Sequence, residues 1–284
     1  MVKKIEQVKV LLDALPYIKK FSGEIFVIKY GGSAQVDSNL KDKVAQDILL
    51  MYLMGIKPVI VHGGGKKISQ LLEKLEVSSK FIDGLRVTDA DTMEVVEMVL
   101  SGNINKEITT LINQHGAKAI GISGKDANFL TAKPIDIDKY GFVGDIVSVD
   151  ESVIINLLNE KFIPVIAPIA ASIDAKNHPG YNINADLAAS KIAASLGARK
   201  IIFMTDTPGV MDKDKKILST LQKDEIIALK EDGTIEGGMI PKVDACIEAI
   251  EAGVNKAHII DGRVEHSLLL EVFTSEGVGT VIKR

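Results

Sequence analysis

The stretch KPVIVHGGGKKI, residues 57–68, decides the fold class because it joins an apolar run to a helical pattern through three glycines. Gly63, Gly64 and Gly65 follow the strand-like residues, and Lys66 begins the helical segment. Glycines at such a junction let backbone N–H groups turn toward an anion, and the helix N-terminus adds a partial positive charge. The stretch therefore predicts a strand–helix unit with either an anion site or a plain tight turn.

Two familiar nucleotide-binding loops do not match this stretch. A dinucleotide-binding loop needs a small residue at its sixth position, which is Ile68 when Gly63 is counted as the first. A P-loop needs a lysine followed by serine or threonine, whereas Lys66 is followed by Lys67. The three glycines, taken alone, are equally compatible with a turn that binds no ligand.

The same alternation of apolar runs and helical patterns continues along the chain and predicts an α/β fold, with helices on both faces of a mainly parallel sheet. Ligands bind at the carboxyl edge of such sheets, where Lys29, His62, Thr205 and Asp206 fall. Residues 131–150 instead indicate a hairpin of strands without a helical period. The six predicted strands are EIFVIKY (24–30), KPVIVHG (57–63), AKAIGIS (117–123), FIPVIAPIA (162–170), RKIIFMTD (199–206) and KAHIID (256–261).

Turn-forming residues mark a boundary between two lobes. The segment DAKNHPGYN, residues 174–182, separates an apolar strand from a new helix and predicts a hinge near residues 172–180. The chain is therefore divided into an N-terminal helix, residues 1–22, and two lobes, residues 23–176 and 177–284.

The N-terminal helix carries an apolar stripe that includes Leu12 and Leu15. Such a stripe fits a helix that covers its own domain, and it also fits an arm that packs on another subunit. The pattern alone favours the first interpretation, because most amphipathic helices cover a core.

Composition narrows the class of protein. The 284 residues are 46% hydrophobic and 25% charged, as in ordinary globular proteins, and the net charge of −4 disfavours nucleic acid as a partner. No apolar run is long enough to span a membrane, and the N-terminus lacks a signal-peptide core, so we expect a cytoplasmic protein without a membrane partner. Cys246 is the single cysteine, which excludes an intrachain disulfide, and no zinc signature surrounds it.

A second glycine pair, in FVIKYGGSA, favours an anion site over an empty turn. Lys29 lies near the end of an apolar strand, where an unpaired ammonium is costly to bury, and Gly31 and Gly32 follow. A lysine at the solvent edge of the strand is the alternative. Two glycine-rich strand ends, one with a lysine, indicate a cleft for an anionic substrate.

The C-terminal half holds two polar helix starts. In GYNINADLAASKIA, a helix cap explains Asn184 but leaves Asn182 and Asp186 for another role. In EGGMIPKVDA, Pro241 indicates a first helical turn, and Lys242 lies where a helix normally prefers an acid. A bound anion would compensate for that lysine.

A third segment, FMTDTPGVM, ends another predicted strand. Its Thr205, Asp206 and Gly209 could contact a nucleotide, although the segment by itself is compatible with a simple turn.

Taken together, these motifs resemble the amino-acid kinase superfamily and, within it, the N-acetyl-L-glutamate kinases. The resemblance runs through KYGGSA, VHGGGKKI, GLRVTD, SGNINKEI, GISGKD, GFVGDI, YNINAD, MTDTPGV and GGMIPK, and it covers residues 25–284. It implies an αβα sandwich in which residues 23–176 hold the acceptor and residues 177–284 hold ATP. It also implies ATP-dependent phosphorylation of the γ-carboxylate of N-acetyl-L-glutamate, the second step of arginine biosynthesis.

The resemblance assigns roles to individual residues. Lys29 and Lys242 stabilise the transferring phosphoryl group and Asp186 orients both lysines, while Mg²⁺ is held largely by the ATP phosphates and water. Because the acceptor carboxylate is already an anion, no general base is required, and His62 is interpreted as structural. The remaining assignments are Gly64 and Gly65 for the γ-carboxylate, Gly31 and Gly32 for the phosphate path, Arg86 and Asn182 for the rest of the acceptor, and Thr205, Asp206 and Gly209 for the nucleotide. For Arg86, a surface ion pair with Asp83 or Asp89 is the alternative.

Both ends of the chain are similar to the branch of this family that L-arginine inhibits. In that branch, N-terminal helices interlace dimers into a hexamer, a trimer of dimers, which reverses the preference for a helix that only covers its own domain. EHSLLLEVFTSEGVGT belongs to this resemblance, which makes Lys200, His266, Glu271 and Gly277 candidates for the arginine site, although Glu271 could be an ordinary exposed residue. Some relatives bind a PII-type signalling protein, so such a protein is a candidate partner.

Two alternatives stay open. The closer one is a kinase of the same superfamily that acts on another carboxylate or carbamate, such as glutamate or aspartate. The other is a catalytically silent regulator on the same fold that binds nucleotide or arginine, although retention of Lys29, Lys242 and Asp186 argues against it.

Overall fold

The computed structural model describes residues 2–173, 178–275 and 277–284 of the chain. Across these ranges it has an eight-stranded sheet in the order β12-β14-β13-β11-β1-β2-β8-β5, in which only the β13–β14 pair is antiparallel. All six predicted strands are present, so the mainly parallel sheet is confirmed. The strands are β1 Ile25–Tyr30, β2 Lys57–His62, β5 Ala119–Ser123, β8 Ile163–Ala167, β11 Lys200–Thr205, β12 Thr220–Gln222, β13 Ala257–Asp261 and β14 Thr280–Lys283.

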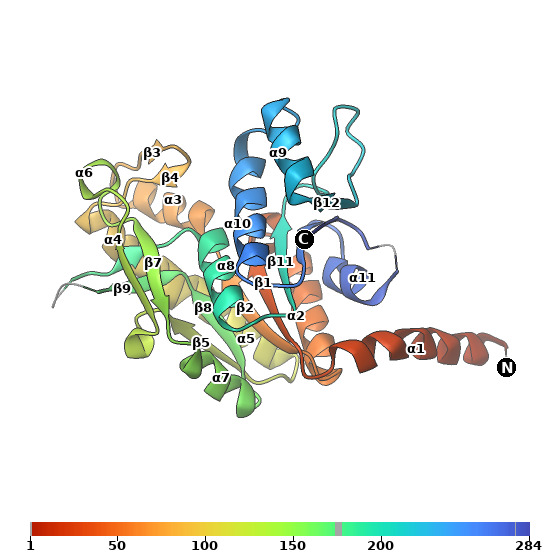
Figure 1. The fold of residues 1–284 in the computed structure, drawn as a ribbon. Coiled ribbons are helices and arrows are strands. Elements are labelled where there is room, and N and C mark those ends of the chain that lie inside the picture. Colours follow the sequence, from red (N-terminus) through yellow and green to blue (C-terminus); the bar gives the residue numbers. More distant parts are fainter. Residues whose placement is uncertain (1, 174–177, 276) are drawn as a thin grey trace.

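Helices cover both faces of this sheet, as expected for an αβα sandwich (Figure 1). Side chains alternate between faces along a strand, so Phe26 and Ile28 of β1 pack in one apolar cluster and Val27 packs in the other. The first cluster includes residues of α2 Ser38–Leu53, α5 Asn105–Gln114 and α11 Ser267–Phe273. The second includes residues of α7 Glu151–Asn159, α8 Ala185–Ser195 and α10 Ile240–Glu251.

The predicted hairpin is present but contains a helical turn. β6 Leu130–Pro134 and β7 Gly144–Val149 pair antiparallel, and α6 Ile137–Tyr140 lies between them, so the expectation of no helix in this segment is wrong. Asp136 caps α6 by accepting a hydrogen bond from the Lys139 backbone N–H, which stabilises so short a helix. These strands belong to a smaller sheet with β9 Ile169–Ser172 and β10 Tyr181–Asn182.

The remaining elements include a π-helical segment. A continuous helical run passes from α4 Ala90–Glu97 through the π-helix η2 Met98–Ile104 into α5, and π-helical segments are frequent at functional sites. The predicted lobe boundary between residues 176 and 177 lies outside the described residues. The other elements are η1 Gly32–Gln35, α3 Gly65–Lys74, β3 Phe81–Ile82, β4 Leu85–Arg86, η3 Asp126–Asn128, α9 Lys223–Glu231 and η4 Gly237–Met239.

The N-terminal helix α1, Val2–Phe21, extends away from the body of the protein (Figure 1). Its last turns pack on the domain, since Phe21 is buried and the ring of Tyr17 lies 6.4 Å from that of Phe273. Farther out, Leu12 is 58% exposed and Leu15 is 41% exposed. Among residues 12–21, whose side chains the structure describes, the helix therefore covers its own domain at its C-terminal end.

None of the helices that the structure describes combines the length and apolarity needed to cross a membrane.

Candidate functional site

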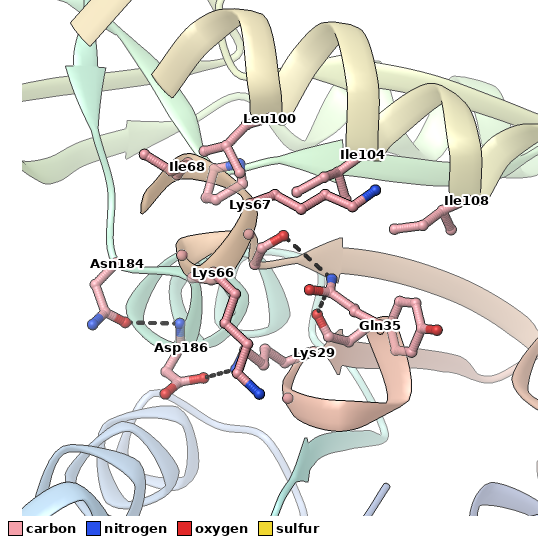
Figure 2. Close-up of a pocket in the computed structure, with 18 of the residues that line it drawn as sticks. Lys29, Gln35, Lys66, Lys67, Ile68, Leu100, Ile104, Ile108, Asn184 and Asp186 are labelled. Carbon is pink, nitrogen blue, oxygen red and sulfur yellow. Dashed lines mark hydrogen bonds and ion pairs between the residues drawn. The ribbon is translucent and has the colours of Figure 1, made fainter. Parts of the chain in front are cut away.

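A cavity of about 370 Å³ opens at the carboxyl ends of β1 and β2. Its walls include the first glycine loop (residues 31–32), the second glycine loop (residues 63–65) and the start of α8. Figure 2 shows Lys29, Lys66 and Asp186 among the residues that line it. Parallel strands bring their carboxyl ends to one edge, which is why these distant segments meet. Of the predicted residues, those that line the cavity are Lys29, Gly31, Gly32, Gly64, Gly65, Arg86, Asn182 and Asp186.

Asp186 joins the two predicted lysines. Lys29 has the same strand parity as Val27 and faces α8, where its Nζ lies 2.9 Å from Asp186 Oδ1. Lys242, in the first turn of α10, places its Nζ 3.5 Å from Asp186 Oδ2. The Lys29 side chain is 12% exposed, so the alternative of a lysine at the solvent edge is wrong.

The charge of this cluster is fixed by its surroundings. Asn184 caps α8 by accepting hydrogen bonds from the backbone N–H groups of Asp186 and Leu187, which sets the start of the helix. Burial opposes ionisation of Asp186, but the ammonium groups of Lys29 and Lys242 hold the pKa of this carboxyl below its usual value. One carboxylate with two ammonium groups leaves a net positive charge beside the cavity.

Two of the predicted glycines lie where neighbouring atoms leave no room for a side chain. Gly32 has a φ of +69°, and a Cβ there would collide with Asp206 Oδ1, so a side chain would be strained and would clash. A Cβ at Gly64 would collide with Ile104 Cδ1, because the second glycine loop presses against the π-helix η2. At both positions, therefore, the backbone lies so close to neighbouring atoms that only glycine fits.

The start of α3 supplies donors to the cavity. The Ile68 backbone N–H makes the first hydrogen bond of this helix, to the Gly64 carbonyl. The backbone N–H groups of Gly65, Lys66 and Lys67 precede it and have no intrahelical acceptor, and these residues line the cavity. Such free donors at a helix N-terminus suit an anion.

Arg86 is buried beside the second glycine loop. Its guanidinium stacks 4.6 Å from the centre of the Phe81 ring, and Nη2 donates to Gly65 O at 3.0 Å and to Ser69 Oγ at 2.8 Å. The alternative of a surface ion pair is wrong: Asp83 binds Lys139, and Asp89 caps α4. Burial lowers the pKa of Arg86 from its high ordinary value.

Asn182 lies across the cavity on β10. Its Nδ2 donates to Thr88 Oγ1 at 3.2 Å, and its backbone N–H donates to Phe142 O at 2.8 Å. These bonds fix the amide next to the cavity.

The proposed nucleotide residues are more dispersed. Thr205 and Asp206 lie at the end of β11, and Asp206 Oδ2 is 3.9 Å from Lys66 Nζ, next to the first glycine loop. Gly209 is separate from the cavity, since a Cβ there would lie 2.6 Å from Thr280 Oγ1. The structure thus brings Asp206 to the site and leaves Gly209 on the adjoining loop.

Sequence reasoning missed several polar residues in the cavity wall, among them Gln35 and Glu107. Gln35 Nε2 donates to Tyr30 O at 2.9 Å and to Gly63 O at 3.2 Å. Glu107 accepts hydrogen bonds from Lys41 and Lys67. Glu107 falls within the quoted SGNINKEI motif, whereas a lone glutamine gives no sequence signal.

The described ranges 2–173, 178–275 and 277–284 contain no group of three or more His, Cys, Asp and Glu side chains that could hold a metal ion.

Three of the four predicted arginine-site residues gather beneath the end of α1. Glu271 is buried, so the alternative of an exposed helix residue is wrong, and its Oε2 accepts a hydrogen bond from the Val278 backbone N–H at 2.8 Å. Gly277 passes so close that a Cβ would lie 2.8 Å from Glu271 Oε2. Lys200 Nζ lies 5.0 Å from the centre of the Phe21 ring, and burial lowers the pKa of this lysine to about 8.

The histidine in this cluster differs from the predicted one. His258 Nδ1 lies 2.6 Å from Glu271 Oε1, whereas His266 Nδ1 lies 2.5 Å from Asp47 Oδ1 on α2. His258 Nε2 is buried and has no hydrogen-bond partner among the described residues. The KAHIID strand was predicted, but the sequence alone did not reveal which histidine would face Glu271.

Comparisons with known proteins fit this geometry. The Amino acid kinase family model matches residues 24–261. The chain is 69% identical over 282 residues to "Acetylglutamate kinase" of a Nitratiruptor species, and the match covers 99% of both chains.

Among solved structures, the chain is similar to N-acetylglutamate synthase from Neisseria gonorrhoeae. For the complex with coenzyme A and N-acetyl-glutamate, the TM-score is 0.86 at 27% identity, over 98% of this chain and 63% of the synthase chain. For the complex with coenzyme A and L-arginine, it is 0.82 at 25% identity, over 97% and 65% of the two chains. The protein thus spans less than two thirds of the synthase.

Proposed function

The chain belongs to the amino acid kinase family and is a kinase, and from this premise we propose that it phosphorylates the γ-carboxylate of N-acetyl-L-glutamate with ATP. The products are N-acetyl-L-glutamyl 5-phosphate and ADP, in the second step of arginine biosynthesis. The observation that carries the proposal is the bridge of Asp186 to Lys29 and Lys242 beside a cavity with two glycine loops. The 69% identity over 282 residues to a relative named acetylglutamate kinase supports the choice of acceptor.

In the proposed reaction, an oxygen of the γ-carboxylate attacks the γ-phosphorus of ATP, and the bond to the β-phosphate oxygen breaks. Lys29 from β1 and Lys242 from α10 stabilise the negative charge on the transferred phosphoryl group. Asp186 holds these two lysines at a fixed separation. Phosphoryl transfer depends mainly on such positioning and charge stabilisation. No base is needed because the attacking carboxylate is already ionised at neutral pH.

The acceptor's two carboxylates would be held by the second glycine loop and by Arg86, which lies beside it. Backbone N–H groups of Gly64 and Gly65 receive the γ-carboxylate, and Arg86 pairs with the α-carboxylate, for which its planar guanidinium is suited. Asn182 holds the acceptor from the facing strand. The stacking of Arg86 on Phe81 supports this role because it keeps the guanidinium oriented before substrate binds.

The phosphates of ATP would pass the first glycine loop, where Gly31 and Gly32 leave space for them. Thr205, Asp206 and Gly209 would contact the nucleotide from the loop after β11. Mg²⁺ would be carried by the ATP phosphates and would neutralise part of their charge. The two lysines remain the protein's own cations for the transferred group.

A coupled assay of ADP release tests this proposal, with N-acetyl-L-glutamate, L-glutamate and L-aspartate as acceptors in parallel. We expect efficient turnover with N-acetyl-L-glutamate alone, because a free α-ammonium would place an extra cation near Arg86. Preferred turnover of glutamate or aspartate would assign the site to another carboxylate kinase. Absence of turnover despite ATP binding would favour a silent regulator.

We further propose that L-arginine inhibits the enzyme by binding at the Glu271 cluster, and that α1 joins dimers into a hexamer. Glu271 offers a buried carboxylate, and the unpartnered Nε2 of His258 can accept an N–H from a guanidinium, so His258 takes the place expected for His266. Lys200 and Gly277 complete the site, and the exposed Leu12 and Leu15 give α1 a surface for another subunit. The structure of the related synthase with L-arginine supports this ligand.

Deletion of residues 1–20 tests the arm. We expect the truncated protein to sediment as a dimer with weakened arginine inhibition, and a truncated hexamer would contradict the role of α1. A PII-type partner and a cytoplasmic location stay predictions from the sequence.

A further inference from the structure

Two polar side chains contact the carbonyl oxygen of Gly63, and neither has a role in the proposed reaction. Gln35 Nε2 lies 3.2 Å from this oxygen, and His62 Nδ1 lies 3.0 Å from it. Gly63 immediately precedes Gly64 and Gly65, the residues assigned to the acceptor carboxylate. A group that fixes the Gly63 carbonyl therefore fixes the peptide plane that leads into the second glycine loop.

Gln35 also links this loop to the first one. The same Nε2 donates to Tyr30 O at 2.9 Å, directly before Gly31, and the Gly63 backbone N–H donates to Tyr30 O at 3.0 Å. Figure 2 shows the Gln35 amide between the two carbonyl groups. One primary amide, with two N–H donors, therefore spans the ends of β1 and β2 at the point where both strands enter their glycine loops.

The hydrogen-bond geometry fixes the tautomer of His62. A carbonyl oxygen can only accept, so Nδ1 must carry the proton, and Nε2 is left as an acceptor for Asn105 Nδ2 at 3.2 Å. The orientation of the Asn105 amide follows from its other contacts, because Nδ2 donates to Val165 O at 2.8 Å and Oδ1 accepts from Lys106 Nζ at 3.1 Å. His62 is fully buried, and burial lowers its pKa to about 4, so the ring is neutral at pH 7.

We propose that Gln35 and His62 are positioning residues that hold the second glycine loop at a fixed distance from the first. This inference rests on the proposed function, in which the acceptor lies on one loop and the phosphate path follows the other. Asn105, from the SGNINKEI motif, donates to His62 Nε2 and so favours the Nδ1–H tautomer. Its effect on the loop is therefore exerted through His62. Misplacement of reacting groups by about 1 Å can lower a rate on the order of 10²-fold, and the loops must keep their separation for the acceptor to face the phosphorus.

Two substitutions at His62 separate positioning from packing. In His62→Asn, the amide nitrogen can occupy the place of Nδ1 and still donate to Gly63 O, whereas in His62→Gln the amide reaches the place of Nε2 instead. Both variants lose the ring and should lose similar thermal stability. We expect His62→Asn to keep kcat within a few fold of the parent protein and His62→Gln to lower kcat on the order of 10²-fold, with a smaller change in KM. Equal losses of kcat at equal Tm would overturn the proposal for His62.

At Gln35, the test is Gln35→Met, which keeps the length of the side chain and removes both donors. Gln46→Met is the matched control, since Gln46 donates to Asp42 on its own helix and does not line the cavity. We expect kcat to fall tenfold or more for Gln35→Met and to stay at the parental value for the control. Parental kcat in Gln35→Met would remove Gln35 from the positioning role.

A spectroscopic readout keeps the inference independent of the substrate. The ¹⁵N chemical shifts of His62, assigned with the His62→Asn variant as the reference, report which ring nitrogen carries the proton in the full-length protein. We expect the Nδ1–H tautomer at pH 7, and Nε2–H or a charged ring would refute the arrangement. Failure of N-acetyl-L-glutamate as acceptor would leave this result unchanged and would count against the proposed function alone.

Discussion

Two buried carboxylates, Asp186 and Glu271, show how one fold can use the same group in opposite ways. Asp186 is already matched by two ammonium groups, from Lys29 and Lys242, and the surplus positive charge lies beside a cavity. Glu271 contacts His258, and burial lowers the pKa of that imidazole, which favours its neutral form. Asp186 therefore serves to place cations that are already present, whereas Glu271 can still accept a cation from a ligand.

The polar atoms around the two carboxylates support this distinction. Hydrogen bonds to Oε2 from Val278 and to Oε1 from His258 hold the Glu271 carboxylate, and they keep its pKa below the usual value although burial opposes ionisation. Lys200 is nearby, but burial beneath Phe21 lowers its own pKa to about 8. A buried carboxylate with incomplete charge compensation is costly, and a bound guanidinium would reduce that cost.

The largest expected effect is at the Asp186 cluster. We predict that Lys29→Ala and Lys242→Ala each lower kcat on the order of 10²- to 10³-fold, with much smaller increases in KM, because the charge they stabilise grows in the transition state. Steady-state kinetics checks this, with Lys213→Ala as a control, since Lys213 forms an exposed ion pair with Asp232. Unchanged kcat in either variant would remove that lysine from catalysis.

Substitution of Glu271 should have a smaller effect, and it should change arginine inhibition rather than kcat. We predict that Glu271→Gln leaves kcat without arginine within a few fold of the parent and raises the arginine concentration for half-inhibition at least tenfold, because a neutral amide no longer attracts a guanidinium. Asp186→Asn should do the reverse, with low kcat and intact arginine binding measured by calorimetry. If Glu271→Gln bound arginine as tightly as the parent, the site would have to lie elsewhere.

The smallest effect concerns stability around Lys200. Its pKa is about 8 in the folded protein and about 10.5 in an unfolded chain, so the unfolded state binds more protons between these values. The contribution of this group to the free energy of unfolding therefore falls as pH drops from about 10.5 to about 8 and is lowest below pH 8, a change of order 3 kcal/mol.

Thermal denaturation of Lys200→Met across pH 7 to 10.5 measures this effect. We expect the variant to lack the rise in Tm that the parent shows over this range, a difference of a few degrees. Identical pH profiles of Tm for the two proteins would contradict the lowered pKa of Lys200.

Local patterns predicted the strands and glycine loops because they depend on neighbouring residues. Apolar runs such as KPVIVHG form strands wherever their side chains can be buried on both faces, and Asn184 caps α8 through contacts two and three residues away. The hairpin at residues 131–150 was found for the same reason, while its single helical turn, too short to leave a period, was missed.

Side-chain partners distant in sequence could not be predicted in this way. From the sequence, Asp83 or Asp89 was an alternative ion-pair partner for Arg86. The folded chain instead stacks its guanidinium on Phe81 and bonds it to Ser69. The resemblance made His266 and Glu271 candidates for one arginine site, but the histidine that contacts Glu271 is His258 of β13, since the cluster is assembled from β11, β13 and α11. Gln35 had no sequence signal because its role depends on two carbonyl groups that meet only in the sheet.

The sequence by itself determined the α/β class and the glycine loops at the strand ends, and it predicted an anionic-substrate site, because periodicity and backbone requirements are local properties. The resemblance implied that Asp186 orients Lys29 and Lys242, and the tertiary structure supplied the geometry of that bridge. Tertiary structure alone decided that Glu271 faces His258 and that Gln35 joins the two glycine loops. The physical reason is that these contacts join different strands, helices and loops, and their geometry is set by sheet order and helix packing rather than by the local sequence pattern.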